Sequence, residues 1–288
     1  MLPPLSTRVR RRIARHLSTK PFIMRNDSPL VSFTFDDVPD TAYTNGAVVL
    51  EEYGIRGTFY IASGTCGTLD TYWRVIDREQ VRGLYARGHE IACHTFSHAA
   101  VDDLDAHAME EECRRNLETM QELCPGVKMT NFCYPDGVVS LLRKLQLQKR
   151  FDTCRGIFEG VNAGIIDLGL LKVIELYDRT LSDDKLRHVL RRARDRNGWV
   201  IFYVHDVAQR PSHMGCTPSL LRSTIKAVQE QNFQCLSIRQ ALPVIGYSAK
   251  SEVAGSKASA RLPAVTRRAN VLLGEISHGV SGRHADQP

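Results

Sequence analysis

Strand-like and helix-like segments alternate along most of this 288-residue chain, and this alternation is the feature that most limits its fold. Apolar, β-branched runs predict strands, and amphipathic runs between them predict helices. The expected strands lie at residues 31–37, 57–63, 89–94, 129–135, 151–154, 199–205 and 233–238. The expected helices lie at residues 41–53, 77–88, 103–124, 140–149, 183–196 and 218–232. Strands and helices in this order are typical of parallel βαβ units, so the chain is predicted to be α/β, with a (β/α)7-type barrel as a single domain.

Composition divides the chain into three parts. Residues 1–28 form a basic extension, which is predicted to be helical over residues 7–17. Residues 29–247 are expected to form the barrel domain. Residues 248–288 are rich in Ser, Ala, Gly, Lys and Arg, and such a composition predicts a poorly ordered tail.

The net charge of +6 is unevenly placed, because five arginines lie between Arg8 and Arg15. A run of this kind either forms a solvated helix, the preferred interpretation, or contacts an anionic membrane. Basic and aromatic residues are not interleaved, so no nucleic-acid partner is expected. No stretch approaches the ~20 apolar residues that cross a bilayer, and no apolar core of a signal peptide follows the arginines. We therefore expect a cytoplasmic protein that contacts the inner membrane, if at all, through its basic N-terminus.

Eight cysteines are irregularly spaced, and none forms a CxxC pair. Cys93, Cys133 and Cys235 lie inside apolar runs, where a thiol behaves as a small hydrophobic group. Neither a disulfide framework nor a cysteine metal site is predicted. Free thiols fit a reducing compartment.

Titratable residues recur where the predicted strands end. Asp36 and Asp37 close the first strand, His94 closes the third, Asp136 follows the fourth and His205 closes the sixth. In a barrel of this type, the carboxyl ends of the strands carry the active site. These residues are therefore the candidates for chemistry.

His94 and His98 are four residues apart, and on one helical turn this spacing would place both imidazoles on the same side. Together with a carboxylate they could hold a metal ion and leave open positions; the alternative is a capping turn with surface histidines. Adjacent residues that leave a strand point in different directions, so one of Asp36 and Asp37 can bind a metal while the other faces a substrate. For the two acids the alternative is an exposed turn. For His205 it is a satisfied residue of the core or rim.

Four motifs in the chain resemble those of the polysaccharide deacetylase family, the NodB-type carbohydrate deacetylases of carbohydrate esterase family 4. Residues 34–40 (TFDDVPD) resemble the family motif TFDDG, and residues 94–98 (HTFSH) match H-[ST]-x-x-H. Residues 132–137 (FCYPDG) and 204–206 (VHD) resemble the third and the last motif. The resemblance covers roughly residues 30–240 and implies a distorted (β/α) barrel.

The resemblance also implies an activity: removal of N-acetyl groups from an N-acetylated sugar or polysaccharide precursor, free or lipid-linked. The implied ligands of a divalent metal, commonly Zn²⁺ with Co²⁺ as an alternative, are Asp37, His94 and His98. Asp36 would be the general base, His205 the general acid, and the backbone N–H of Tyr134 would bind the oxyanion. Such a metal polarises a carbonyl and lowers the pKa of a bound water, which amide hydrolysis requires.

The chain departs from the family pattern at three points. Val38 and Pro39 stand where the first motif has Gly. The third motif lacks its usual arginine, and Arg155 could supply that guanidinium from the next strand; the alternative is a structural surface arginine. No acid that tunes the catalytic histidine is evident from the sequence. The candidates for that acid are Asp152, Asp167 and Asp206.

Three other functions stay open. A same-fold amidohydrolase could cleave a non-sugar C–N bond, because the motifs define chemistry better than substrate. A catalytically silent carbohydrate-binding relative would explain the missing arginine. A glycosidase could use Asp36 and Asp136 as acid and base without a metal. Residues 156–171 are expected to form part of the substrate wall.

Overall fold

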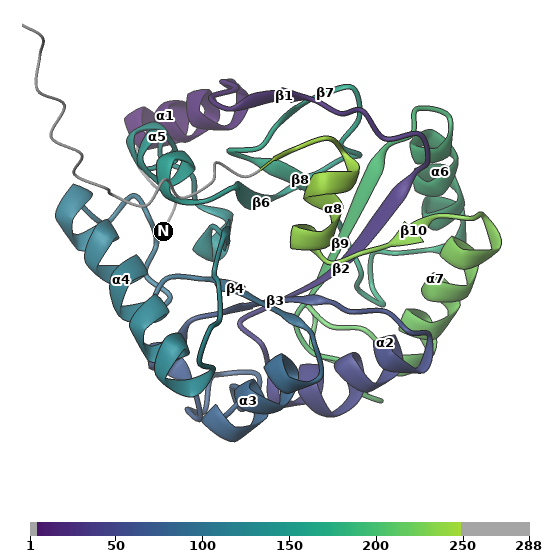
Figure 1. Cartoon of the computed structure of the whole chain (residues 1–288), viewed down its shortest axis with the longest axis horizontal. Helices are drawn as coiled ribbons and strands as arrows, with labels where there is room; N and C mark the ends of the chain where they lie inside the picture. Colours follow the sequence, from purple (N-terminus) through teal and green to yellow (C-terminus); the bar gives the residue numbers. More distant parts are fainter. Residues whose placement is uncertain (1–4, 249–288) are drawn as a thin grey trace, which may run out of the picture. The chain divides into compact units, whose positions relative to one another are not determined.

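Seven parallel strands close into a barrel in the computed structural model, which describes residues 5–248 (Figure 1). Around the ring they are β2 (Leu30–Asp36), β3 (Thr58–Ile61), β4 (Glu90–Cys93), β5 (Asn131–Cys133), β6 (Thr153–Glu159), β8 (Leu171–Glu175) and β9 (Trp199–Val204). β9 pairs in parallel with β2 and closes the ring. The described residues fall within one compact unit. The predicted single-domain (β/α)7-type barrel is therefore confirmed. Apart from Ser248, the tail predicted to be poorly ordered lies outside the described residues.

Helices surround these strands (Figure 1). They are α1 (Leu5–His16), α2 (Val48–Glu52), α3 (Arg78–Ala86), α4 (Ala106–Leu123), α5 (Leu141–Arg150), α6 (Asp183–Arg194), α7 (Pro218–Glu230) and α8 (Ile238–Val244). Short π- or 3₁₀-helical segments are η1 (Ala42–Ala47), η2 (Ser63–Thr65) and η3 (Pro135–Gly137). Side chains at the helix starts accept hydrogen bonds from backbone N–H groups that the helix leaves unpaired. The residues that do so at α3, α4, α6 and α7 are Asp77, Asp105, Ser182 and Thr217.

The seventh strand of the ring is β8, which the sequence analysis did not predict, and not the strand expected at residues 233–238. In that region only β10 (Gln234–Cys235) is extended, and it pairs with β2 beside the ring. Ser237 and Gln240 then form a capping box that begins α8. The expected strand is short because the capping box turns the chain into a helix.

Residues 156–171 are more regular than the predicted substrate wall. They contain the end of β6 and the strand β7 (Ile165–Asp167), which pairs antiparallel with β1 (Pro21–Ile23). The two strands form a separate ribbon, and none of residues 156–171 lines the pocket described below.

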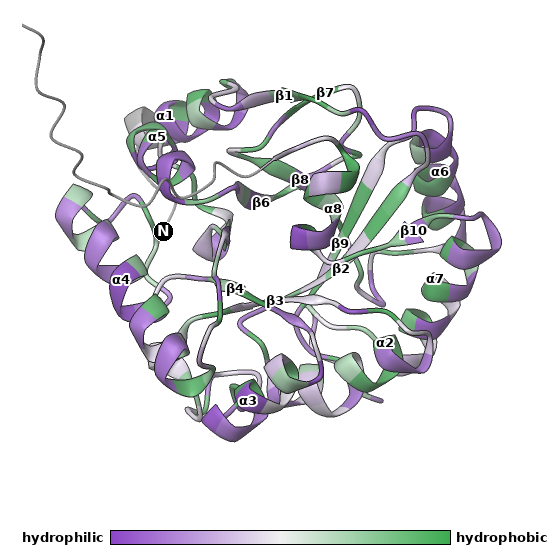
Figure 2. Cartoon of the chain, in the orientation of Figure 1, coloured by the Kyte–Doolittle hydropathy of each residue, from purple (hydrophilic) through white to green (hydrophobic). Residues whose placement is uncertain are grey.

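The strands carry apolar and polar residues, as their mixed colours in Figure 2 indicate. Among the buried polar side chains, Glu90 accepts hydrogen bonds from Thr58 and Asn131, and Asn131 accepts one from Thr153. Every residue of β2, β3, β4, β5 and β9 is buried, which parallel strands covered on both faces require. Phe35 and Phe59 stack with their ring centroids 4.5 Å apart. The rigid core holds the strand ends at constant separations. Among the helices described, none has the length and apolarity to span a membrane.

Candidate metal and catalytic site

The carboxyl ends of β2 and β4 bring Asp37, His94 and His98 together. Oδ1 of Asp37 lies 2.9 Å from Nε2 of His98 and 3.3 Å from Nε2 of His94. One ligand atom from each residue lies within 4.8 Å of the other two. These are the three residues that the resemblance implied as metal ligands, although they are distant in sequence.

The two histidines converge from a loop, so the predicted helical turn is wrong. Thr95 and His98 have positive φ values of 62° and 60°. The backbone N–H groups of Phe96 and Ser97 both donate to one carboxylate oxygen of Glu112 on α4, each over 2.8 Å. This carboxylate holds the loop in a non-helical conformation.

The loop after β2 separates the two aspartates. Asp37 and Val38 have φ values of 55° and 42°, in the left-handed region that a β-branched residue rarely adopts. Val38 stands where the family motif has Gly, and its buried carbonyl accepts a hydrogen bond from Ile76 over 2.9 Å. The left-handed backbone directs Asp37 toward the histidines while Asp36 stays on the strand.

The proton position on His94 follows from its partner. Nδ1 lies 2.9 Å from the backbone carbonyl of Cys133, which can only accept, so Nδ1 carries the hydrogen. Nε2 of the same ring faces the carboxylate of Asp37, so a cation, either a proton or a metal ion, is needed between the two atoms. A carboxylate oxygen with two imidazole nitrogens is a donor set that suits Zn²⁺ or Co²⁺, and a hydrogen-bonded second nitrogen is usual for such a ligand.

Asp37 and His98 shift one another's pKa in opposite directions. Burial alone would raise the pKa of Asp37, but hydrogen bonds and charges of His94 and His98 outweigh it and hold that pKa well below its usual range. Burial alone would lower the pKa of His98, but the carboxylate of Asp37 raises it overall. The group therefore favours a full negative charge on its carboxylate, which a divalent cation requires.

Asp36 has a different partner, the guanidinium of Arg155 on β6. Nη2 of Arg155 donates to Oδ1 of Asp36, and both side chains are almost completely buried. Cζ of Arg155 lies 4.7 Å from the ring centroid of Tyr60. Burial would lower the pKa of Arg155, but Asp36 raises it overall. The alternative of a surface arginine is wrong.

His205 completes the group from the end of β9. Its Nε2 lies 3.8 Å from Oδ2 of Asp37. Its Nδ1 lies 3.3 Å from the carbonyl of Met214 and 3.4 Å from the hydroxyl of Tyr177. The indole of Trp73 stacks on the imidazole with ring centroids 5.5 Å apart. The ring is therefore held on one face and along one edge.

The acids proposed to tune His205 all have other partners. Asp152 accepts from Tyr247 over 3.0 Å, and Asp167 pairs with Lys144 over 2.6 Å. Asp206 accepts from the Ser212 hydroxyl and backbone at 2.6 and 2.8 Å. Within residues 5–248 no hydrogen bond or ion pair joins these three acids to His205. A carbonyl and a tyrosine hydroxyl occupy the Nδ1 side, and neither could be predicted from local sequence.

The predicted oxyanion role of Tyr134 is wrong. Its backbone N–H donates to the carbonyl of Arg155 over 3.0 Å, because β5 and β6 pair there, and its hydroxyl donates to Gly169 over 3.1 Å. Two residues later, Asp136 is exposed with a φ of 55°. Its charge contributes to the raised pKa of His98, which places Asp136 close to that ligand.

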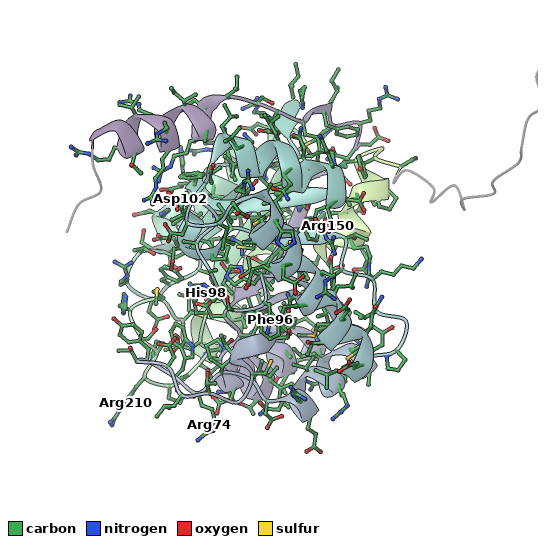
Figure 3. All side chains as sticks on the ribbon, turned by 90° about the vertical axis from the view of Figure 1, so that its left-hand side faces the viewer. Arg74, Phe96, His98, Asp102, Arg150 and Arg210 are labelled. Carbon is green, nitrogen blue, oxygen red and sulfur yellow. The ribbon has the colours of Figure 1, made fainter. Side chains whose placement is uncertain are left out.

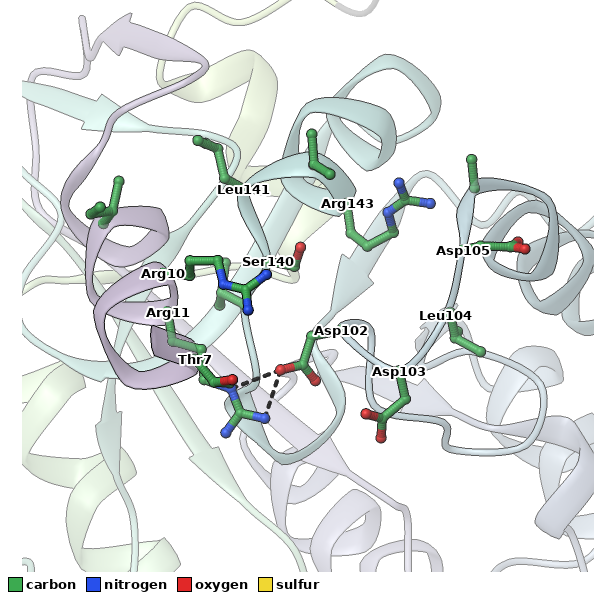
Figure 4. Close-up of a pocket in the computed structure, with 14 residues that line it drawn as sticks. Thr7, Arg10, Arg11, Asp102, Asp103, Leu104, Asp105, Ser140, Leu141 and Arg143 are labelled. Atoms are coloured by element: carbon green, nitrogen blue, oxygen red, sulfur yellow. Dashed lines mark hydrogen bonds and ion pairs between the residues drawn. The ribbon is translucent and has the colours of Figure 1, made fainter. Parts of the chain in front are cut away.

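A pocket of about 800 Å³ lies between α1, α5 and the loop before α4, and none of the candidate site residues described above lines it (Figure 4). Its wall includes Asp102, four residues after His98, and Ser140, four residues after Asp136. Figure 3 shows Asp102 and His98 on the same side of the molecule. The pocket wall combines arginines, aspartates and a serine with leucines, so it offers donors, acceptors and apolar surface.

Part of this chain is similar in sequence to known proteins. Residues 24–151 match the family described as polysaccharide deacetylase. The chain is 31% identical over 104 residues to a chitooligosaccharide deacetylase from Rhizobium leguminosarum bv. trifolii, covering 35% of this chain and 44% of that protein. The chain matches less than half the length of this and the other curated deacetylases compared with it.

Solved structures share the fold. One is the Bc1960 peptidoglycan N-acetylglucosamine deacetylase, with 16% identity, a TM-score of 0.56, and 79% of this chain and 92% of that chain covered. Another is a family 4 acetyl xylan esterase from Clostridium thermocellum in complex with a cobalt ion, with 21% identity, a TM-score of 0.54, and coverage of 76% and 93%. Residues 24–151 are thus similar in sequence to the polysaccharide deacetylase family, and the closed barrel is similar in fold to solved deacetylase and esterase structures.

Proposed function

We propose that the protein is a metal-dependent N-deacetylase that hydrolyses the acetamide of an N-acetylated saccharide. The observation that carries this proposal is the convergence of Asp37 Oδ1 with Nε2 of His94 and His98, beside a buried carboxylate that an arginine holds. The names of the curated relatives, chitooligosaccharide deacetylase and chitin deacetylase, support the choice of substrate class.

Asp37, His94 and His98 would hold a divalent metal, Zn²⁺ or Co²⁺. When bound, such an ion polarises the acetamide carbonyl and lowers the pKa of a coordinated water. The hydrogen bond from His94 Nδ1 to Cys133 favours the tautomer in which Nε2 is the ligand nitrogen.

Asp36 is proposed as the general base that takes a proton from the attacking water. Arg155 holds this carboxylate in one orientation through a charge-assisted hydrogen bond. The exposed N–H of Asp136, instead of that of Tyr134, would donate to the oxyanion of the tetrahedral intermediate.

His205 is proposed as the general acid. Its Nδ1 proton can be donated to the carbonyl of Met214, so a second proton on Nε2 would face the reacting group and pass to the departing amine. Trp73 acts as a positioning residue, because its stacked indole restricts the tilt of the imidazole.

The remainder of the saccharide would extend toward the pocket whose wall includes Asp102 and Ser140. A sugar hydroxyl both donates and accepts hydrogen bonds, which a wall with Asp102, Ser140 and Arg143 can satisfy. The leucines of the wall would pack against the apolar faces of sugar rings. A lipid-linked N-acetylated sugar would be a more specific substrate within this class.

The test is acetate release from N-acetylglucosamine oligomers by the full chain after chelation and after addition of Zn²⁺ or Co²⁺. We expect no acetate from the chelated protein and recovery with metal. Sugar binding without acetate would favour the silent carbohydrate-binding alternative. Chelator-resistant release of reducing ends would favour the glycosidase. Acetate or ammonia release only from non-sugar amides in a substrate panel would favour the amidohydrolase.

A further inference from the structure

The outer side of α1 exposes large apolar side chains. Val9, Ile13 and Leu17 are 50%, 51% and 48% exposed, and they follow one another at intervals of four residues. The helical period places them on one side of α1 and its last turn, while the buried Ala14 lies on the other. A surface helix usually has one apolar stripe, which faces the core, whereas α1 exposes large apolar side chains to solvent.

Neighbouring elements extend the apolar side of α1. Leu142 and Leu145 on α5, which packs against α1, are 68% and 40% exposed. Ile23 on β1 and Ile165 on β7 are direct cross-strand partners, so they point to the same face, and they are 60% and 73% exposed.

We call this set, on α1 and its last turn, α5, β1 and β7, the outer face; Figure 1 shows these elements along one edge of the barrel. Of the eleven large apolar side chains exposed in the described part of the chain, seven belong to it. Single exposed apolar residues need no explanation, but a gathering on adjacent elements marks an interaction site.

The outer face is also strongly basic. Arginines 8, 10, 12 and 15 are exposed on α1, and the sequence from Leu5 to Asn26 contains no acidic residue. Arg8 and Arg12 have no ion-pair partner among residues 5–248. Exposed arginines beside an apolar stripe are typical of helices that lie in the headgroup region of an anionic membrane.

α1 is firmly docked by its inner side, so the exposed stripe is not the result of a loosely packed helix. Nζ of the fully buried Lys144 donates to the carbonyls of Ala14 and Leu17 over 3.2 and 2.6 Å. The guanidinium of Arg11 pairs with Asp102 over 2.6 Å. The inner side therefore provides the fold contacts and leaves the outer stripe available.

We propose that the outer face docks on an anionic lipid bilayer. The apolar side chains would enter the headgroup region while Arg8 and Arg12 contact lipid phosphates. Charge argues against two other occupants of the outer face. Residues 249–288 are themselves basic, with six Lys or Arg against three acids. A second copy would bring two arginine-rich helices together, and like charges repel. The proposal does not rest on the deacetylase activity, although Ile13 and Leu142 of the outer face also line the pocket described above.

Sedimentation of the full chain with vesicles tests this proposal. We expect binding to equimolar phosphatidylcholine–phosphatidylglycerol vesicles, little binding to pure phosphatidylcholine vesicles, and a decrease with salt because the charges are screened. Val9→Ser/Ile13→Ser and Arg8→Glu/Arg12→Glu should each lower the partition coefficient by about tenfold or more.

Two matched controls separate the outer face from general surface effects. Val48→Ser removes an exposed apolar residue from α2, and Arg192→Glu/Arg194→Glu reverses two exposed charges on α6. Both controls should bind as the parent does. The proposal would be overturned if Arg192→Glu/Arg194→Glu lowered vesicle binding as much as Arg8→Glu/Arg12→Glu does, or if the parent protein did not bind anionic vesicles. A lipid-free dimer that Val9→Ser/Ile13→Ser disrupts would instead assign the face to a second copy.

Discussion

Asp36 and Asp37 are adjacent in sequence, but they belong to two different halves of the candidate site. Asp36 ends β2, is only 3% exposed and has the guanidinium of Arg155 as its partner. Asp37 begins a left-handed loop and faces two imidazoles. The comparison teaches that one peptide unit with unusual backbone geometry can direct one carboxylate to a metal and its neighbour to the substrate.

The largest loss of metal binding and turnover is expected from a substitution of Asp37, in the loop after β2. Asp37→Ala removes the carboxylate on which His94 and His98 converge, so Zn²⁺ binding should be lost. Turnover should fall by more than about 10⁴-fold, beyond the loss of a single general base. Titration calorimetry with Zn²⁺ and an acetate assay check this result. A variant that still binds Zn²⁺ tightly would show that Asp37 is not a ligand.

Asp36→Asn should separate the halves. The amide keeps the shape of the side chain but cannot take a proton, so Zn²⁺ should still bind while kcat falls by about 10²- to 10⁴-fold. Metal content measured on the same sample as kcat is the internal control. Full turnover in this variant would remove Asp36 as the base.

Arg155→Ala should sharpen the comparison through stability. It leaves Asp36 as a buried charge without its partner, and breaking such a pair costs about 3–5 kcal/mol of unfolding free energy. We expect a lower denaturation midpoint and reduced kcat, with Zn²⁺ still bound. In the Asp36→Asn background the stability loss from Arg155→Ala should change, because the two residues interact. Strict additivity would mean that the ion pair has no energetic role.

The smallest expected effect is a pH dependence of Zn²⁺ binding by Asp37, His94 and His98. The pKa of His98 is raised in the metal-free protein, because Asp37 outweighs burial. Protons and metal compete for Nε2, so Zn²⁺ affinity should be full above this raised pKa. It should then fall by about tenfold per pH unit below it, starting at a higher pH than for an ordinary histidine. Isotherms across the acid range measure it; an onset below the ordinary histidine pKa would contradict the Asp37–His98 contact.

Most of the fold was predictable because its signals are local. Apolar runs with caps located β2, β9 and most helices within a few residues. β8 was missed because five residues with an exposed lysine, Lys172, carry a weak strand pattern that becomes regular only when β6 and β9 flank it. The strand expected at residues 233–238 is limited to β10, because Ser237 and Gln240 form a capping box that begins α8.

The sequence alone determined the alternation that makes a barrel, the acids and histidines at the strand ends, and the resemblance of their motifs to the polysaccharide deacetylases, because each depends on residues close together in the chain. Only the tertiary structure decided which groups meet. It paired Arg155 with Asp36, gave the Nδ1 side of His205 to Met214 and Tyr177, and used the N–H of Tyr134 in strand pairing. The physical reason is that these contacts depend on barrel closure and on left-handed backbone at a few residues, and neither leaves a periodic pattern in sequence.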